Sequence, residues 1–265
     1  MSVLPAFEHV RGESVESVVA QMGFDDVPYA GGTELLLAMR IRLLRPERLI
    51  DLKRIPELQR IELVDGSIEI GGAVSHIVAA RHPLVADRLP MLSDVLGRVG
   101  NVRVRTQGTL GGNLCFAEPK SDVAAALIAL DAEVDLRSTA GMRTVAVDEF
   151  VIGAFYTVRE PEELLTTIRV PVRPDLKGVY LKYQTMERPT VGVAAVREGA
   201  TRTVVVAAVG ERPVRFVFPD DQPIDPAAVA DGVDPEADLT GSVDYKRHVT
   251  RVYVERAARA LEESA

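Results

Sequence analysis

A Gly-Gly step at residues 31–32 stands between a short extended stretch and a helix start, and it restricts how the chain around it can fold. The segment VPYAGGTELLLAMRIRLLRPERLIDL predicts a strand, a tight turn, a helix over about 33–43 that ends before Pro46, and a returning strand. Adjacent glycines allow positive φ and let a ligand approach the backbone, while the amides of a helix N-terminus favour an anion. The alternative is a plain turn in which Thr33 caps the helix. The residues alone leave both interpretations open.

A second Gly-Gly step lies at Gly111-Gly112, preceded by the hydroxyl of Thr109 and followed by the amide side chain of Asn113. Two such loops in one domain can approach the two phosphates of a dinucleotide from opposite sides. Neither loop has the GxGxxG fingerprint of a Rossmann domain or the GxxxxGK[ST] pattern of a nucleoside triphosphatase. A third glycine pair, at 71–72, has the same spacing, but its flanks differ, so we infer no structural repeat.

Ser121 and Asp122 follow the second loop and come directly before an apolar helix predicted over 123–130. Either residue can serve as the N-cap, a role that needs no ligand. In a glycine-lined cleft, Asp122 can instead accept hydrogen bonds from sugar or ribityl hydroxyls, as acidic residues do in dinucleotide sites. Both roles remain possible at this point.

The remaining patterns predict an α+β protein in three parts. Asp65-Gly66 marks a hairpin, and Pro171 with Pro174 marks a linker. Segment 102–122 is rich in turn residues and lacks the periodicity of a long helix. We therefore divide the chain into residues 1–55, 56–172 and 173–265. Further helices are expected over 14–23, 85–99 and 244–262, and further strands over 132–138, 142–150, 163–172, 179–186, 191–198 and 202–210.

Charge and composition exclude several classes of function. A net charge of -8 argues against a nucleic-acid-binding protein, which needs a basic face. The sequence shows no signal peptide and no apolar run of membrane-spanning length, which predicts a cytoplasmic protein. The single cysteine, Cys115, cannot hold an iron-sulfur cluster alone, and the four histidines form no metal-binding motif. We expect no metal in this chain.

Three segments together resemble the FAD-binding medium subunit of the carbon monoxide dehydrogenase and xanthine dehydrogenase family of molybdenum hydroxylases. They read AGGTELL, RPERLIDLKRIPEL and TQGTLGGNLCFAEPKSDVAAALIALDAEVDL. The resemblance continues through LLTTIRVP, the Tyr180-Leu181-Lys182 strand and the C-terminal helix SVDYKRHVTRVYVERA. It implies a two-subdomain FAD-binding fold of the PCMH type, followed by a small C-terminal domain of one sheet and a helix.

The resemblance also implies which residues bind the cofactor. The first loop would hold the pyrophosphate through its amides with Tyr29 beside it, the second loop would hold the other side, and Asp122 would bind the flavin's sugar-like chain. Leu165 and Lys182 would lie near the ring or the adenine. The implied FAD-binding residues are Tyr29, Ala30, Gly31, Gly32, Thr33, Glu34, Leu35, Thr109, Gly111, Gly112, Asn113, Asp122, Leu165 and Lys182.

Three positions depart from the pattern expected of this family. Segment 102–106 reads VRVRT where P-Q-V-R-N is common, and Glu34 and Glu118 each replace an aspartate. The bound FAD is expected to be non-covalent, because no flavin-attachment histidine or cysteine adjoins either loop.

The resemblance implies an electron-transfer role with no catalytic residue on this chain. A molybdenum-cofactor large subunit would oxidise the substrate, [2Fe-2S] clusters on a small subunit would relay electrons, and FAD would pass them to an external acceptor. The chain would therefore work in a hetero-oligomer. Two alternatives remain: a free-standing FAD oxidoreductase of the same fold, and a non-catalytic assembly subunit.

Overall fold

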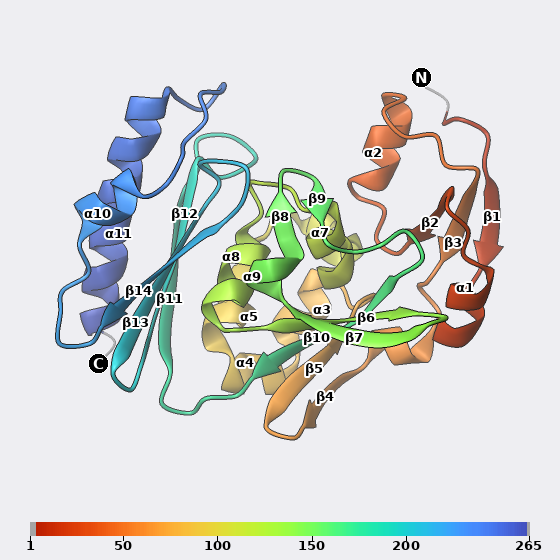
Figure 1. Cartoon of the computed structure of the whole chain (residues 1–265), viewed down its shortest axis with the longest axis horizontal. Coiled ribbons are helices and arrows are strands. Elements are labelled where there is room, and N and C mark those ends of the chain that lie inside the picture. Colours follow the sequence, from red (N-terminus) through yellow and green to blue (C-terminus); the bar gives the residue numbers. More distant parts are fainter. Residues whose placement is uncertain (1–3, 264–265) are drawn as a thin grey trace.

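The computed structural model describes residues 4–263, so the outermost ends of the first and last predicted parts lie outside it. The chain forms three main β-sheets, each built from a successive stretch of sequence, with helices packed on or between them (Figure 1). Helices and sheets are mixed as predicted. The boundaries at 55 and 172 between the two FAD-binding subdomains and the C-terminal domain stay predictions.

The N-terminal sheet has three parallel strands in the order β1-β3-β2, with bounds Glu8–Arg11, Arg48–Asp51 and Asp26–Tyr29. Helix α1 (Val15–Gln21) begins after Ser14, whose side chain accepts a hydrogen bond from the Ser17 amide, which confirms the predicted start. Helix α2 (Leu35–Arg40) is shorter than predicted, because Arg42 adopts a left-handed conformation (φ 65) and the chain turns away. Thr33 does not cap α2, whose N-cap position is taken by Glu34 without a side-chain bond.

The middle sheet has five antiparallel strands in the order β4-β5-β10-β6-β7. Their bounds are Ile61–Val64, Ser67–Gly71, Leu164–Pro171, Glu133–Ser138 and Gly141–Ala146. The predicted hairpin at Asp65-Gly66 is present, with positive φ at both residues, as a tight two-residue turn requires. The strand predicted over 142–150 ends at Ala146 and continues as α9 (Val147–Phe150), followed by the short strands β8 (Val151–Gly153) and β9 (Tyr156–Thr157).

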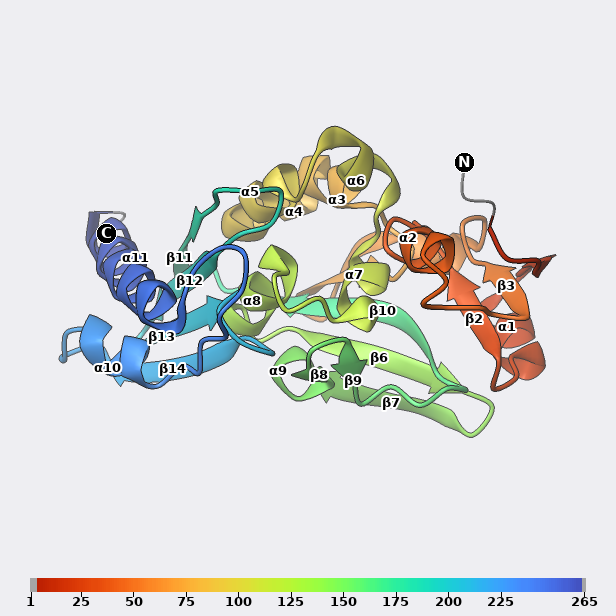
Figure 2. The same ribbon diagram turned by 90° about the horizontal axis from the view of Figure 1, so that it is seen from above.

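Six helices, α3 to α8, lie on one side of the middle sheet (Figure 2). Their bounds are His76–Arg81, Pro83–Arg88, Pro90–Arg98, Val102–Gln107, Leu110–Phe116 and Asp122–Ala129. The single helix predicted over 85–99 is two helices, because Pro90 lacks an N–H and starts α5. The turn-rich segment that follows forms two short helices, each started by a polar cap, Asn101 for α6 and Thr109 for α7.

The C-terminal sheet has four antiparallel strands in the order β11-β12-β13-β14, with bounds Lys177–Tyr183, Val191–Glu198, Thr201–Ala207 and Val214–Pro219. Helix α11 (Val243–Glu263) covers one face, and α8 and α5 pack on the other (Figure 1). Strand β14 and helix α10 (Pro226–Asp231) were not predicted. Because α8 contacts β12 and β13, the C-terminal sheet and the middle part share one hydrophobic core.

Candidate functional site

A cavity of about 670 Å³ opens where the three parts of the chain meet. Its wall is formed by the loop before α2, the segments around α6 and α7, and the 184–190 tip of the hairpin between β11 and β12. The volume is in the upper part of the range of roughly 300–1,000 Å³ for ligand pockets. The cavity can therefore hold a large organic cofactor.

The first glycine loop presents unbonded amides to this cavity. Among the described residues, the N–H groups of residues 32–35 make no hydrogen bond, and Gly32 has a φ of +70. Tyr29 does not line the cavity: a Cβ at Gly32 would lie 2.4 Å from its ring, so the ring supports the turn from behind. The loop is thus held in a conformation that offers hydrogen-bond donors to an anion.

Two other glycines bring the loops together instead of opening the cavity. A Cβ at Gly31 would lie 2.2 Å from the Gln107 carbonyl oxygen, and a Cβ at Gly111 would lie 2.5 Å from the Gly72 carbonyl oxygen. The second and third glycine pairs therefore touch through Gly111 and Gly72, and the first pair packs against Gln107 and Gly108, just before the second loop.

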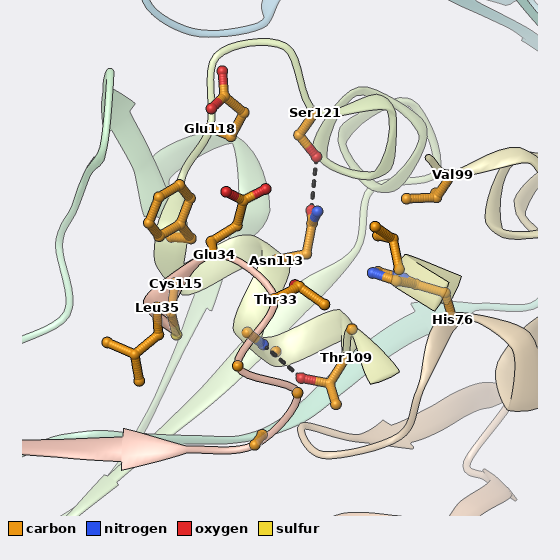
Figure 3. A pocket seen from close by; sticks show the side chains of 18 of the residues that line it. Thr33, Glu34, Leu35, His76, Val99, Thr109, Asn113, Cys115, Glu118 and Ser121 are labelled. Carbon is orange, nitrogen blue, oxygen red and sulfur yellow. Dashed lines mark hydrogen bonds between the residues drawn. The ribbon is translucent and has the colours of Figure 1, made fainter. Parts of the chain in front are cut away.

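The amides of the second loop are bonded inside the protein. The N–H groups of Leu110 and Gly111 donate to Val74 and Gly72, and the N–H of Gly112 donates to the Thr109 hydroxyl at 3.1 Å. Ser121 donates to the Asn113 side-chain oxygen at 2.7 Å (Figure 3). This loop therefore offers a ligand two features: the backbone surface of Gly112, which no side chain covers, and the side-chain amide nitrogen of Asn113.

Asp122 joins the helical part of the site to the C-terminal sheet. It is the first residue of α8 and is buried, and it accepts hydrogen bonds from Tyr180 at 2.6 Å and Lys182 at 2.7 Å, both on β11. Burial and the nearby carboxylate raise the pKa of Tyr180 well above its usual value, so the phenol stays a donor. Lys182 is thus an ion-pair partner of Asp122 and not a solvated lysine.

Arg188, on the hairpin tip, closes the cavity from the C-terminal side. Its guanidinium pairs with Glu34 of the first loop at 2.9 Å and with Glu118, which follows the second loop. Glu34 and Glu118 are the two departures from the aspartates expected at those positions, and both longer carboxylates reach the same arginine.

Several residues of the wall had no assigned role in the sequence. Leu165 lines the cavity as the resemblance implied, but Val99, His76 and Cys115 line it as well. His76 is 2% exposed, and burial lowers its pKa to about 4. Burial raises the pKa of the Cys115 thiol to about 11. Both groups are therefore neutral at neutral pH. No pattern in the sequence around these residues marks them as part of a binding site. His76 reaches the cavity wall only because α3 packs beside the second loop.

Four of the five carboxylates of the wall are held by cations. Glu34 and Glu118 pair with Arg188, Asp122 pairs with Lys182, and Glu163 pairs with Arg143 at 2.6 Å. The fifth, Glu187, is exposed on the hairpin tip. The arrangement suits binding and orientation of a cofactor and shows no acid–base pair poised for proton transfer within the described residues.

Comparisons with known proteins identify the family. Residues 6–173 match the family described as the FAD binding domain in molybdopterin dehydrogenase. The chain belongs to this family.

Similarity extends over the full length of relatives. The carbon monoxide dehydrogenase medium chain of Hydrogenophaga pseudoflava is 33% identical, with 97% of each chain covered. A solved structure of carbon monoxide dehydrogenase from the same organism, lacking the Mo-pyranopterin moiety, superposes with a TM-score of 0.90 at 31% identity, covering 98% of this chain and 99% of that one. Quinoline 2-oxidoreductase from Pseudomonas putida 86 superposes with a TM-score of 0.92 at 28% identity, covering 99% of each chain. The resemblance inferred from the sequence and the PCMH-type fold are confirmed.

FAD is accordingly the cofactor, and the cavity fits it. The unbonded amides of residues 32–35 suit a pyrophosphate, the bare surface of Gly112 permits close approach, and the buried polar side chains of the wall suit the hydroxyls and bases of a dinucleotide. The chain is an oxidoreductase subunit. Among the described residues, none of the helices is long and apolar enough to cross a membrane.

Proposed function

We propose that this chain is the FAD-carrying electron-transfer subunit of a molybdenum hydroxylase complex. It receives electrons from iron-sulfur clusters of a small partner subunit and passes them to an external acceptor, while a large molybdenum-cofactor subunit oxidises the substrate. Full-length similarity to a medium chain of carbon monoxide dehydrogenase supports the role. The observation that carries it is the wall of the cavity, where His76 and Cys115 are neutral and the carboxylates of Asp122 and Glu118 are paired with cations.

FAD supplies the redox chemistry when bound, exchanging one or two electrons. The residues of this chain bind and orient it. In this proposal the amides of residues 32–35 hold the pyrophosphate, with Thr33 as an additional hydroxyl donor, and Gly112 with Asn113 forms the facing wall. Asp122, held by Tyr180 and Lys182, accepts from hydroxyls of the sugar-like chain, and Leu165 contacts a ring.

Tyr29 and Gly111 act indirectly in this scheme. Tyr29 supports the turn at Gly32, and Gly111 lets α7 approach the middle sheet, so that the facing wall stands at the correct distance. Ala30, Gly31, Glu34 and Leu35 complete the first loop, with Glu34 fastened to Arg188.

The test compares the chain alone with the assembled complex. The native complex is purified, and its molybdenum, iron and FAD are measured together. The chain is then expressed alone, loaded with FAD and mixed with a panel of aldehydes, purines and other N-heterocycles. We expect flavin reduction only after the molybdenum and iron-sulfur subunits are added. Rapid bleaching of the lone chain would instead identify a free-standing oxidoreductase, and a colourless purified protein that takes up no FAD would identify an assembly subunit.

A further inference from the structure

His76 stands out in the FAD cavity because its side chain is deeply buried and has no hydrogen-bond partner within the described residues. It is the first residue of α3 and is 2% exposed. Its Nδ1 atom is enclosed and unpaired, and Nε2 also makes no hydrogen bond among the described residues. A buried polar group without a partner costs about 1–3 kcal/mol, so such a group in a binding cavity calls for an explanation.

The position of the ring is set by backbone contacts and not by its own polar atoms. The His76 amide donates to the Gly108 carbonyl at 3.0 Å, and Ser75 pairs with Thr109 in an isolated bridge. A Cβ at Gly108 would lie 3.3 Å from Nε2, so the imidazole edge rests against a bare glycine. Gly31 also packs against Gly108, which places His76 beside the point where the two loops meet.

The ring points into the cavity. Figure 3 shows the imidazole extending from α3 toward Thr33 of the first glycine loop and Asn113 of the second. Nε2 is the nitrogen that is not sealed from the cavity, whereas Nδ1 is enclosed by the wall. No positively or negatively charged group bonds to the ring within the described residues.

The tautomer follows from these two environments. A neutral imidazole carries one N–H and one lone pair. An enclosed N–H without an acceptor is rarer in proteins than an acceptor without a donor. The proton is therefore better placed on Nε2, facing the cavity, with the lone pair on the enclosed Nδ1.

We propose that His76 is an FAD-contacting residue whose Nε2–H donates a hydrogen bond to an acceptor atom of the cofactor at the junction of the two glycine loops. This inference rests on the proposed FAD site and adds a side chain from a third segment, α3, to the two loops. It also explains the missing partner, which the cofactor supplies.

The test separates a ligand contact from a structural role. His76→Leu removes both nitrogens but keeps an apolar side chain, and His76→Gln keeps an N–H donor. For a ligand contact, we expect the FAD dissociation constant of His76→Leu to rise about 3- to 10-fold, and that of His76→Gln to rise less. The melting temperature of the FAD-free His76→Leu protein should be unchanged or higher, because an unpaired buried group is lost.

His82 is the matched control, since its Nδ1 is also buried and unpaired but it does not line the cavity. His82→Leu should leave FAD affinity at the wild-type value. In FAD-loaded protein labelled with ¹⁵N at its four histidines, the signal that disappears in His76→Gln should report the Nε2–H form.

Wild-type affinity in His76→Leu, or an Nδ1–H signal in the loaded protein, would overturn the inference. So would a lower melting temperature of the FAD-free variant with undiminished stabilisation by FAD, which marks a structural role. If the wild-type protein itself takes up no FAD, the proposed function fails first, and that outcome is distinct from a failure at His76 alone.

Discussion

Gly111 and Gly112 are adjacent in α7, yet the structure predicts opposite consequences when each is replaced by alanine. A Cβ at Gly111 would meet three backbone atoms of Gly72, at 2.5, 2.9 and 3.0 Å. Backbone cannot move aside as a side chain can, and overpacking of this kind costs about 1–3 kcal/mol or more. Removing a helical glycine returns at most about 1 kcal/mol. We expect Gly111→Ala to lower the free energy of unfolding by roughly 1–2 kcal/mol.

Gly112→Ala should instead leave the fold intact and weaken FAD binding. Its Cβ would meet only the Thr109 hydroxyl, at 2.8 Å, and nothing else within 4 Å. Loss of that capping bond costs about 1 kcal/mol, which the gain in helix propensity offsets. The new methyl stands where the cofactor is expected to approach the bare backbone, so we expect at least a tenfold higher FAD dissociation constant, about 1.4 kcal/mol.

The assay pairs urea unfolding of FAD-free protein with FAD titration monitored by flavin fluorescence. Gly97→Ala, in α5 with nothing within 4 Å of the new Cβ, is the control, and it should be slightly stabilised with unchanged affinity. Wild-type FAD affinity of folded Gly112→Ala, or wild-type stability of Gly111→Ala, would contradict these roles of the two glycines.

Four further outcomes are expected. Asp238 pairs with Lys246, which is 1% exposed, so Asp238→Ala should lower the free energy of unfolding in urea by about 3 kcal/mol. The added change Lys246→Met should restore most of this stability, because it removes the unpaired buried charge. An unchanged urea midpoint in Asp238→Ala would contradict this. Burial opposes ionisation of Asp238, but hydrogen bonds from Lys120, Thr240 and Lys246 lower its pKa below the ordinary 3.8. The contribution of Asp238 to the free energy of unfolding is therefore present above about pH 4 and is lost as the pH falls further. Asp238→Asn should not show this loss. Acid precipitation should release FAD to the supernatant, because the Cys115 thiol is protonated at neutral pH and so is a poor nucleophile for attaching the flavin. Flavin that stays with the wild-type polypeptide but is released from Cys115→Ala would show a covalent bond. Arg188→Met should raise the FAD dissociation rate roughly fivefold, because two partly exposed ion pairs worth about 0.5 kcal/mol each are lost. A dissociation rate equal to that of wild type would argue against closure of the cavity by the hairpin tip.

Local patterns were sufficient for elements whose signals lie within a few residues. The α1 start at Ser14, the Asp65-Gly66 hairpin and helix α11 all follow from capping, turn chemistry and helical periodicity. Local patterns failed where position in the fold decides: the 85–99 helix breaks at Pro90, and the turn-rich segment before Asp122 forms two short helices that pack on the sheet.

Residue patterns alone were enough to find the two glycine loops and the α+β class, and resemblance added the family with its FAD cofactor. The sequence could not assign separate roles to the glycines. A Gly-Gly pair has the same appearance in the sequence whether it leaves amides unbonded, as at residues 32–35, or permits a close backbone contact, as at Gly111. Only the tertiary structure brought the β11 side chains to Asp122, Arg188 to two loops far from it in sequence, and His76 to the cavity wall. Contacts between distant segments depend on how sheets and helices pack, and no local pattern in one segment records its partner in another.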